Sequence, residues 1–252
     1  MERQYLDLLK KIFDEGDDRM DRTGVGTRAL FGLQMRFNMA DGFPAVTTKK
    51  LAFKAVKSEL LWFLEGSNDD ARLRELNNTD KTIWTANLEA DYWKPHRAHE
   101  TDLGRIYGVQ WRAWRKPDGT VVDQLGEVIE KIKTNPYDRR LIVTAWNPGE
   151  LSEMALPPCH MFFQFFVANG KLSLFMHQRS CDMFLGVPFN IASYSLLLHM
   201  VAQATDLKPG EFVHSLGDAH IYNNHFGAVK EQLAREPLPP PALWLNPDIK
   251  DI

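Results

Sequence analysis

The sequence predicts an α+β fold, in which a β-sheet packs against helices. Two β-type runs flank Asn169-Gly170, a dipeptide that is the strongest short-range signal for a β-hairpin. Apolar residues recur at helical spacing in residues 6–13, and residues 52–64 are typical of a strongly apolar helix. No internal repeat, low-complexity linker or break in composition marks a domain boundary, so we expect residues 1–252 to form a single domain.

The composition excludes several classes of protein. A chain of 252 residues can form one sizeable core, and its net charge of −3 gives no argument for bulk nucleic-acid binding. No apolar run approaches the roughly 18 residues needed to span a bilayer, and residues 1–7 lack the apolar segment of a secretory signal. Two cysteines cannot form a disulfide framework or a four-ligand zinc site. We therefore expect a cytoplasmic protein without a metal, a membrane or DNA as partner.

The first half of the chain alternates helix and strand. Gly16 is placed to end the helix of residues 6–13. Residues 31–37 predict a half-buried strand, because apolar and other residues alternate along them. The apolar positions of that strand are Phe31, Leu33, Met35 and Phe37.

Glu59 is a carboxylate on an apolar face of the helix predicted for residues 52–64. It shares that face with Ala52, Val56 and Phe63. Burying a carboxylate unpaired is costly, so Glu59 needs a partner, a water network or a catalytic task. The alternative is a glutamate at the edge of the helix that reaches solvent, and the pattern alone favours neither.

The second half begins with a polar, turn-rich stretch, residues 66–104. His96 and His99 in this stretch favour a solvated loop over a metal site, because no cysteine or helical frame accompanies them. An amphipathic helix is predicted for residues 124–133, then a strand for residues 141–146.

The hairpin strand of residues 161–167 is apolar at nearly every position, so we expect both of its faces to be covered. A helix over residues 191–205 would cover one face, and a second subunit would cover the other. In a regular two-residue hairpin, Cys159 lies opposite Ser180 and His160 opposite Arg179.

Cys159 is the candidate nucleophile. A nearby arginine favours the thiolate, and the residues opposite Cys159 in the hairpin are polar. A small buried thiol is the alternative. Cys181 has no comparable signal, although a disulfide between the two cysteines is conceivable. A cysteine protease is another interpretation, since His160, His177 and His220 are available. None of these histidines lies in a recognisable protease signature.

Other polar residues predict a nucleotide site. Arginine matches phosphate geometry, and a hydroxyl adds a donor, although each arginine could instead form a surface ion pair. Asn190 could cap a helix or read a base, and His220 and Tyr222 share one face of a strand or loop, where they could hold a sugar. The proposed anion site consists of Arg22, Arg139, Arg140, Arg179 and Ser180.

Seven motifs, in order and covering nearly the whole chain, resemble the thymidylate synthase family. They are Asp21-Arg-Thr-Gly, Glu59-Leu-Leu-Trp-Phe-Leu, Asp138-Arg-Arg, Leu156-Pro-Pro-Cys-His, Gln178-Arg-Ser-Cys-Asp182, Pro188-Phe-Asn-Ile-Ala-Ser-Tyr194 and Gly217-Asp-Ala-His-Ile-Tyr222. The resemblance implies a large twisted mixed β-sheet packed against helices on one face, with the other face forming a homodimer interface. It also implies reductive methylation of dUMP to dTMP, with 5,10-methylenetetrahydrofolate as the co-substrate that donates the carbon and the hydride.

The resemblance also implies roles for individual residues. Cys159 would add to C6 of uracil, Glu59 would organise proton transfers through water, and Tyr107 would help to remove the C5 proton. Asn190 would read the base, and His220 with Tyr222 would bind the 3′-hydroxyl. The catalytic set comprises Cys159, Glu59, Tyr107, Arg179, Asn190 and Asp182. Gln178 would belong to the dUMP site, and the phosphate would be held by Arg22, Arg179 and Ser180, with Arg139 and Arg140 from the other subunit. The folate would meet Asp182, Trp84 and Lys49.

The chain departs from the family pattern in two places. Thr85 stands where the family usually has an aspartate, beside the folate. The sequence ends at Asp251-Ile252, before the tail that closes the family's site, and a chain that lacks this tail is expected to bind dUMP but turn over poorly.

Two other functions compete with this interpretation. A deoxycytidylate hydroxymethylase of the same superfamily suits an aspartate at the position of Asn190, so Asn190 favours uracil. A non-catalytic nucleotide- or RNA-binding relative would not need Cys159 and Glu59.

The family's chemistry also requires Arg179 near both the thiol and the phosphate, whereas strict alternation would turn its side chain away from Cys159. We therefore predict a β-bulge between Asn169 and Asp182 or between Cys159 and Ala168.

Overall fold

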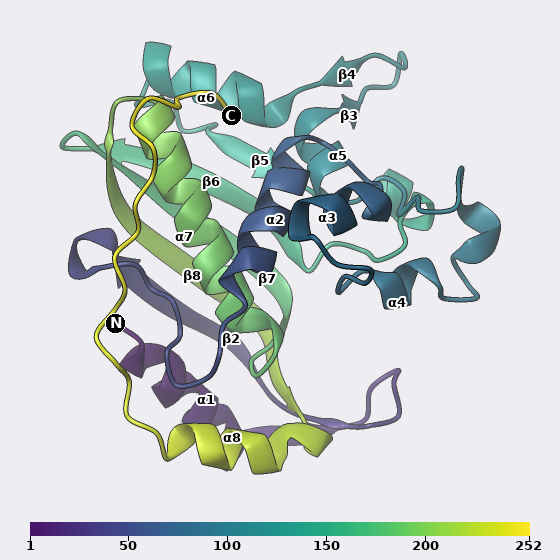
Figure 1. The fold of residues 1–252 in the computed structure, drawn as a ribbon, viewed down its shortest axis with the longest axis vertical. Helices are drawn as coiled ribbons and strands as arrows, with labels where there is room; N and C mark the ends of the chain where they lie inside the picture. Colours follow the sequence, from purple (N-terminus) through teal and green to yellow (C-terminus); the bar gives the residue numbers. More distant parts are fainter.

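A six-stranded mixed β-sheet lies at the centre of the computed structural model, which describes residues 1–252 (Figure 1). The strand order is β1-β2-β8-β7-β6-β5, and all neighbours are antiparallel except the parallel pair β7 and β8. A separate two-stranded ribbon is formed by β3 and β4. The strands are β1 (Asp17–Arg19), β2 (Thr27–Asn38), β3 (Trp114–Arg115), β4 (Val121–Val122), β5 (Ile142–Thr144), β6 (His160–Ala168), β7 (Lys171–Asp182) and β8 (Lys208–Tyr222).

Helices α2 and α7 lie side by side across the sheet (Figure 1). Both are rich in buried apolar residues, and α7 is buried on nearly every side. None of the helices combines the length and the hydrophobicity that a membrane crossing requires. The α-helices are α1 (Arg3–Glu15), α2 (Phe53–Leu64), α3 (Asp70–Asn77), α4 (Thr85–Leu88), α5 (Tyr107–Arg112), α6 (Gln124–Thr134), α7 (Gly186–Ala204) and α8 (Phe226–Leu233). The 3-10 turns are η1 (Met39–Asp41), η2 (Lys94–His96), η3 (Pro148–Glu153) and η4 (Asn223–His225).

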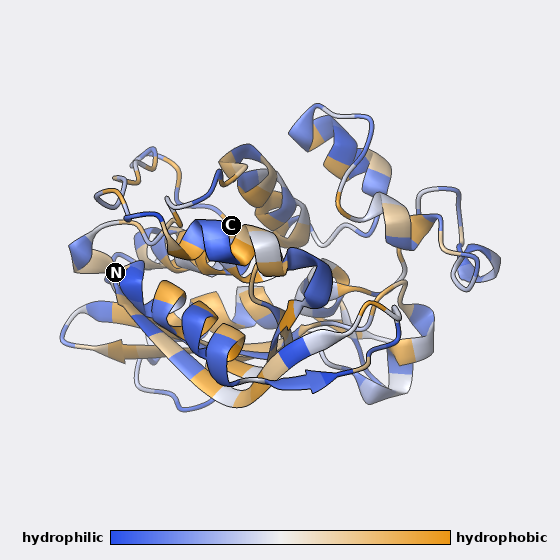
Figure 2. Cartoon of the chain, turned by 90° about the horizontal axis from the view of Figure 1, so that it is seen from below, coloured by the Kyte–Doolittle hydropathy of each residue, from blue (hydrophilic) through white to orange (hydrophobic).

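The predicted α+β fold, with a large mixed sheet packed against helices, is confirmed. The helices predicted for residues 6–13, 52–64, 124–133 and 191–205 are all present, and Gly16 follows α1 as predicted. Figure 2 shows hydrophobic and hydrophilic residues alternating along many of the helices and strands, as in amphipathic elements. Their apolar sides join in one core of 53 buried residues. The strand predicted for residues 141–146 is shorter, because the chain leaves the sheet after Thr144.

The outer face of the sheet is only partly covered. Phe163, Phe165 and Val167 of β6 are buried on the side that faces the core. Phe166, on the other side, is 65% exposed, so one chain covers only one face of this strand, and the cover predicted for the other face, a second subunit, stays a prediction. Phe31 of β2 was predicted to lie on a buried face but is 85% exposed. The left-handed backbone of Gly32, with φ of 77°, interrupts the alternation beside it.

The hairpin of β6 and β7 is irregular at its open end. From Phe162 to Ala168 the pairing follows the regular register, with Phe162 opposite His177. The register shifts between His160 and Phe162, which places His160 opposite Gln178. The predicted β-bulge is therefore confirmed, and the strict pairing of His160 with Arg179 is wrong.

Candidate active site

Cys159 stands where the bulge joins β6 to the preceding loop. Its backbone N–H donates to the hydroxyl of Tyr107 at 2.7 Å, and its carbonyl accepts from the backbone N–H of Arg179 at 2.9 Å. The Arg179 guanidinium reaches back along the same loop and donates to the carbonyls of Pro157 and Pro158, both at 2.9 Å. The proline pair thus holds the arginine on the side of the nucleophile, which a regular ladder would not do.

Burial and nearby positive charge act in opposite directions on the Cys159 thiol. Burial raises the pKa of Cys159, and the charges of Arg179 and Arg22, with a hydrogen bond to Tyr107, only partly offset that rise. The expectation that a nearby arginine favours the thiolate holds for the direction of its effect, because the charge of Arg179 lowers the pKa of Cys159. Here the loss of hydration disfavours the thiolate more strongly than the charge of Arg179 favours it.

Tyr107 begins α5 and is buried among aromatic rings. It stacks on Phe63 with ring centres 5.0 Å apart and meets the edge of Trp84 at 5.8 Å. Burial raises its pKa well above the usual value, so the hydroxyl keeps its proton at neutral pH. The oxygen accepts from the Cys159 N–H, which leaves the hydroxyl proton available as a donor, and the neighbouring Cys159 thiol is one acceptor for it.

Glu59 has the partner that its apolar helix face required. The indole N–H of Trp84 donates to Glu59 Oε1 at 2.7 Å. Burial raises the pKa of Glu59 to about 7, and the hydrogen bond from Trp84 works against that rise. The side chain is half-buried and borders a cavity of about 220 Å³ whose walls include Ile83 and Phe189, which with the Trp84 bond favours the partnered carboxylate over a fully solvated one. A carboxyl group with this pKa can both accept and release a proton near neutral pH.

Asn190 lies inside α7, five residues beyond the N-cap residue Leu185, so the helix-capping alternative is wrong. Its Nδ2 lies 2.9 Å from Nε2 of His160. Burial lowers the pKa of His160 to about 3, so the ring is neutral and its Nε2 accepts from the amide. Asn190 keeps its carbonyl oxygen and one N–H for a ligand. Sequence reasoning missed this role of His160, and only its place beside Cys159 hinted at it.

His220 and Tyr222 share one face of β8, as predicted, with ring centres 5.3 Å apart. His220 lies opposite Asp182 in the parallel pairing of β7 and β8, so the sugar and folate candidates meet at one end of the sheet. Asp218 fixes the imidazole from the same strand, with Oδ1 at 3.0 Å from His220 Nδ1.

Lys49 and Asp182 are neighbours. Burial lowers the pKa of Lys49, and the charge of Asp182 opposes this change. The Lys49 ammonium donates to the carbonyl of Phe184 at 2.6 Å and lies over the ring of that residue. Asp182 accepts from the backbone N–H groups of Phe184 and Leu185 at 3.0 Å each, just before α7 begins.

The remaining anion-site candidates are not all assembled by one chain. Arg22 is exposed on the loop before β2, and its charge lowers the pKa of Cys159. Arg139 and Arg140 are exposed near β5, where Arg140 pairs with Asp138. Ser180 is half-buried in β7.

Gln178 is buried and uses its amide within the protein. Its Nε2 amide donates to the Ser180 carbonyl at 3.0 Å, while its Oε1 lies 2.8 Å from Nε2 of His214. His96 and His99 are exposed, and both Cys159 and Cys181 are free thiols.

The sequence matches the family model described as thymidylate synthase over residues 3–252, which is nearly its whole length. The match includes every element that contributes to the site, from the Arg22 loop to the end of β8. The chain therefore belongs to the thymidylate synthase family, enzymes that methylate dUMP to dTMP with methylenetetrahydrofolate.

Proposed function

We propose that residues 1–252 form one catalytic domain that methylates dUMP reductively through covalent addition of Cys159 to C6 of uracil. 5,10-Methylenetetrahydrofolate supplies first the carbon and then the hydride, which leaves dihydrofolate. The observation that carries this proposal is the meeting of Cys159, Tyr107 and Arg179 at the bulge. A nucleophile, a protonated hydroxyl and a cation then share one water-poor corner.

In the first step the Cys159 sulfur forms a bond to C6, and the electron pair of the C5–C6 double bond moves toward the O4 carbonyl. C5 becomes nucleophilic and attacks the methylene carbon of the folate. Because burial raises the pKa of Cys159, the thiolate forms only when further positive charge or the substrate favours it. Arg179 supplies part of that charge and also binds the phosphate, together with Arg22 and Ser180.

Proton transfers fall to Glu59 and Tyr107. With a pKa of about 7, Glu59 can pass protons through water to and from the O4 carbonyl without a large energetic cost in either direction. Tyr107 helps to remove the C5 proton once the one-carbon bridge has formed. Its buried hydroxyl orients the proton acceptor and keeps its own proton.

Recognition of the substrates uses a different set of side chains. Asn190, oriented by His160, donates to the uracil O4 and accepts from N3–H. His220 and Tyr222 bind the 3′-hydroxyl. We place the folate against Trp84 and Asp182, with Lys49 near its glutamate tail.

A second copy of the chain completes the phosphate site. Arg139 and Arg140 of the partner subunit would bind the same phosphate, and the exposed outer face of the sheet would become the homodimer interface. Their charges would also favour the Cys159 thiolate. Two free thiols fit a reducing compartment, so we place the enzyme in the cytoplasm.

Product analysis tests this function. A chain that carries the family's C-terminal tail is incubated with dUMP or dCMP and methylenetetrahydrofolate, and the nucleotides and folates are separated. We expect dTMP and dihydrofolate in equal amounts from dUMP, and no product from dCMP. Hydroxymethylated dCMP would instead identify a deoxycytidylate hydroxymethylase, and nucleotide or RNA binding without any product would identify a non-catalytic relative. The variant Asn190→Asp should narrow or reverse the preference for dUMP, and an unchanged preference would remove Asn190 as the base reader.

A further inference from the structure

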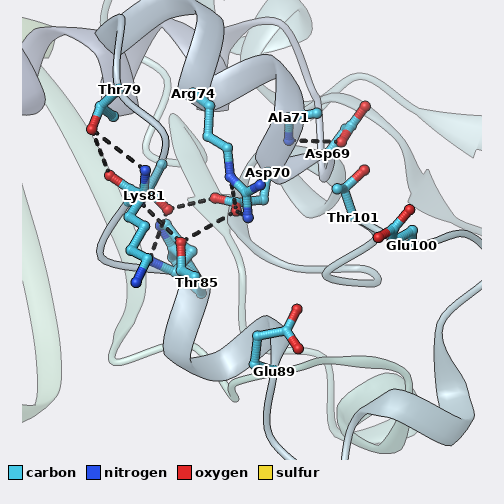
Figure 3. Close-up of polar contacts among 12 residues, drawn as sticks. Asp69, Asp70, Ala71, Arg74, Thr79, Lys81, Thr85, Glu89, Glu100 and Thr101 are labelled. Carbon is cyan, nitrogen blue, oxygen red and sulfur yellow. Dashed lines mark hydrogen bonds and ion pairs between the residues drawn. The ribbon is translucent and has the colours of Figure 1, made fainter.

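Asp70 is the most deeply buried carboxylate of the chain, with none of its side chain exposed, and it lies outside the groups assigned to the reaction. Arg74, one turn further along α3, donates to Asp70 Oδ2 from Nε at 2.8 Å and from Nη2 at 2.6 Å. Figure 3 shows Asp70 between Arg74 and the segment that holds Thr85. A buried carboxylate is tolerated only when its partners satisfy it, so this side chain has a fixed position.

Two threonines connect Asp70 to the turn that precedes α4. The hydroxyl of Thr82 donates to Asp70 Oδ1, and the hydroxyl of Thr85 lies 3.5 Å from Oδ2. Thr85 also accepts from the backbone N–H of Thr82 at 3.0 Å. The two oxygens of the Asp70 carboxylate therefore contact Thr82 and Thr85, which lie on either side of Trp84.

This turn contains Trp84, which leads to Glu59. Because the Thr82 hydroxyl donates to Asp70, its lone pairs face the backbone N–H of Trp84, which donates to it at 3.0 Å. The indole of Trp84 then donates to Glu59 Oε1 at 2.7 Å. A continuous series of hydrogen bonds thus runs from Asp70 through Thr82 and Trp84 to the carboxylate that borders the cavity.

We propose that Asp70 is a positioning residue that fixes Trp84, through Thr82, and thereby sets the position of the Glu59 carboxylate during turnover. The role rests on the proposed function, because it acts only through Glu59. If Asp70 merely attached α3 to the rest of the fold, its partners would affect stability and leave the reaction of the folded enzyme unchanged. Sub-ångström to ångström errors in the position of a proton-transfer group lower turnover far more than substrate binding.

A matched pair of variants at Thr82 separates the two roles. Thr82→Val keeps the shape and removes the hydroxyl, whereas Thr82→Ser keeps the hydroxyl. In a chain with the C-terminal tail, we expect Thr82→Val to lower kcat about tenfold while KM for dUMP changes less than about threefold. Thr82→Ser should keep most of the activity. Asp80→Asn, a change of an exposed aspartate in the same segment, is the control and should behave like the unmodified enzyme.

A double-mutant cycle with Trp84→Phe tests the route. Without the indole donor, Thr82→Val should lower kcat by less than about twofold, because both changes interrupt the same connection. The same tenfold loss in both backgrounds, or an equal loss with Thr82→Ser, would overturn the proposal.

Circular dichroism verifies that each variant is folded. If Thr82→Val does not fold, Asp70→Asn takes its place in the cycle under the same criteria. An unmodified enzyme that makes no dTMP would refute the proposed function, whereas an active one with an unaltered Thr82→Val kcat would refute the positioning role alone.

Discussion

Among single residues, Glu59 shows how the fold sets the chemistry of a side chain. Its pKa rises from 4.5 to about 7 because the carboxylate loses water, and the Trp84 indole returns only part of that stabilisation. A carboxyl group whose pKa is raised on folding stabilises the fold below its unfolded pKa. It loses this contribution as the pH rises through its folded pKa.

Glu59→Gln should therefore change the pH dependence of stability. The free energy of unfolding of the variant, relative to the unmodified protein, should increase by about 1–3 kcal/mol between about pH 4 and about pH 8. The reason is that glutamine carries no charge to desolvate. Urea unfolding at both pH values measures this difference. Glu100→Gln, on an exposed glutamate, is the control, and an equal pH trend for both variants would contradict the account.

Cys159, Glu59 and Asn190 could be chosen as candidates from chemistry and pattern, but their environments could not be predicted from the sequence. The effect of Arg179 on the Cys159 thiol was predicted in the right direction, but the opposing rise in pKa was not, because burial depends on elements far apart in the sequence. The partner of Asn190 is His160, thirty residues earlier in the chain, and no local pattern connects a helix amide to a strand imidazole.

At the scale of elements, the contact between β7 and β8 determines where Arg179 lies. Gly217 of β8 is the neighbour of Arg179, and a Cβ added at Gly217 would lie 2.9 Å from the Arg179 carbonyl oxygen and 3.2 Å from its Cα. These are backbone atoms, so the strands must separate to admit a side chain. Glycine is therefore required here by close approach and not by an unusual φ.

Gly217→Ala should lower the free energy of unfolding by about 1–3 kcal/mol through overpacking. It should also weaken dUMP binding about tenfold, because Arg179 is displaced from the phosphate. Gly227→Ala, in α8, is the matched control, since a Cβ there meets nothing within 4 Å. It should leave dUMP affinity unchanged and raise stability by up to about 1 kcal/mol. Calorimetry of dUMP binding and urea unfolding measure both effects, and equal dUMP affinities for the two variants would contradict this role of Gly217.

The elements themselves were largely predictable, since periodicity and the Asn169-Gly170 turn are local signals. The bulge was predicted from the chemistry that Arg179 must perform, and its position at residues 160–162 came only with the structure. The alternation in β2 predicted that Phe31 is buried, whereas its side chain is exposed, because the left-handed backbone of Gly32 interrupts the alternation there.

For the whole molecule, the central question is whether one chain contains a complete site. A single chain leaves Arg139 and Arg140 exposed near β5 and leaves Phe166 uncovered. A second copy of the chain would account for both facts. The sequence alone does not show this, because the hydrophobic pattern of β6 is the same whether a helix or a second subunit covers the strand.

Subunit complementation tests the proposed dimer. A Cys159→Ser chain and an Arg139→Ala/Arg140→Ala chain should each be nearly inactive alone. After mixing under conditions that exchange subunits, activity should return, since one of the two sites in the mixed dimer has both an intact Cys159 and intact arginines from its partner. Mixing the Cys159→Ser chain with a chain that carries all three substitutions is the control and should restore nothing. No recovery in the first mixture, with exchange verified by native mass spectrometry, would contradict a shared site.

The most direct test of the whole account is the release of tritium from 5-tritiated dUMP by a chain that carries the C-terminal tail. Attack of Cys159 on C6 and loss of the C5 proton must both occur before tritium reaches water. We predict release that requires methylenetetrahydrofolate and that disappears in Cys159→Ser. A folded, dUMP-binding protein that releases no tritium with the folate present, or a Cys159→Ser variant that releases it at the unmodified rate, would contradict the central claim.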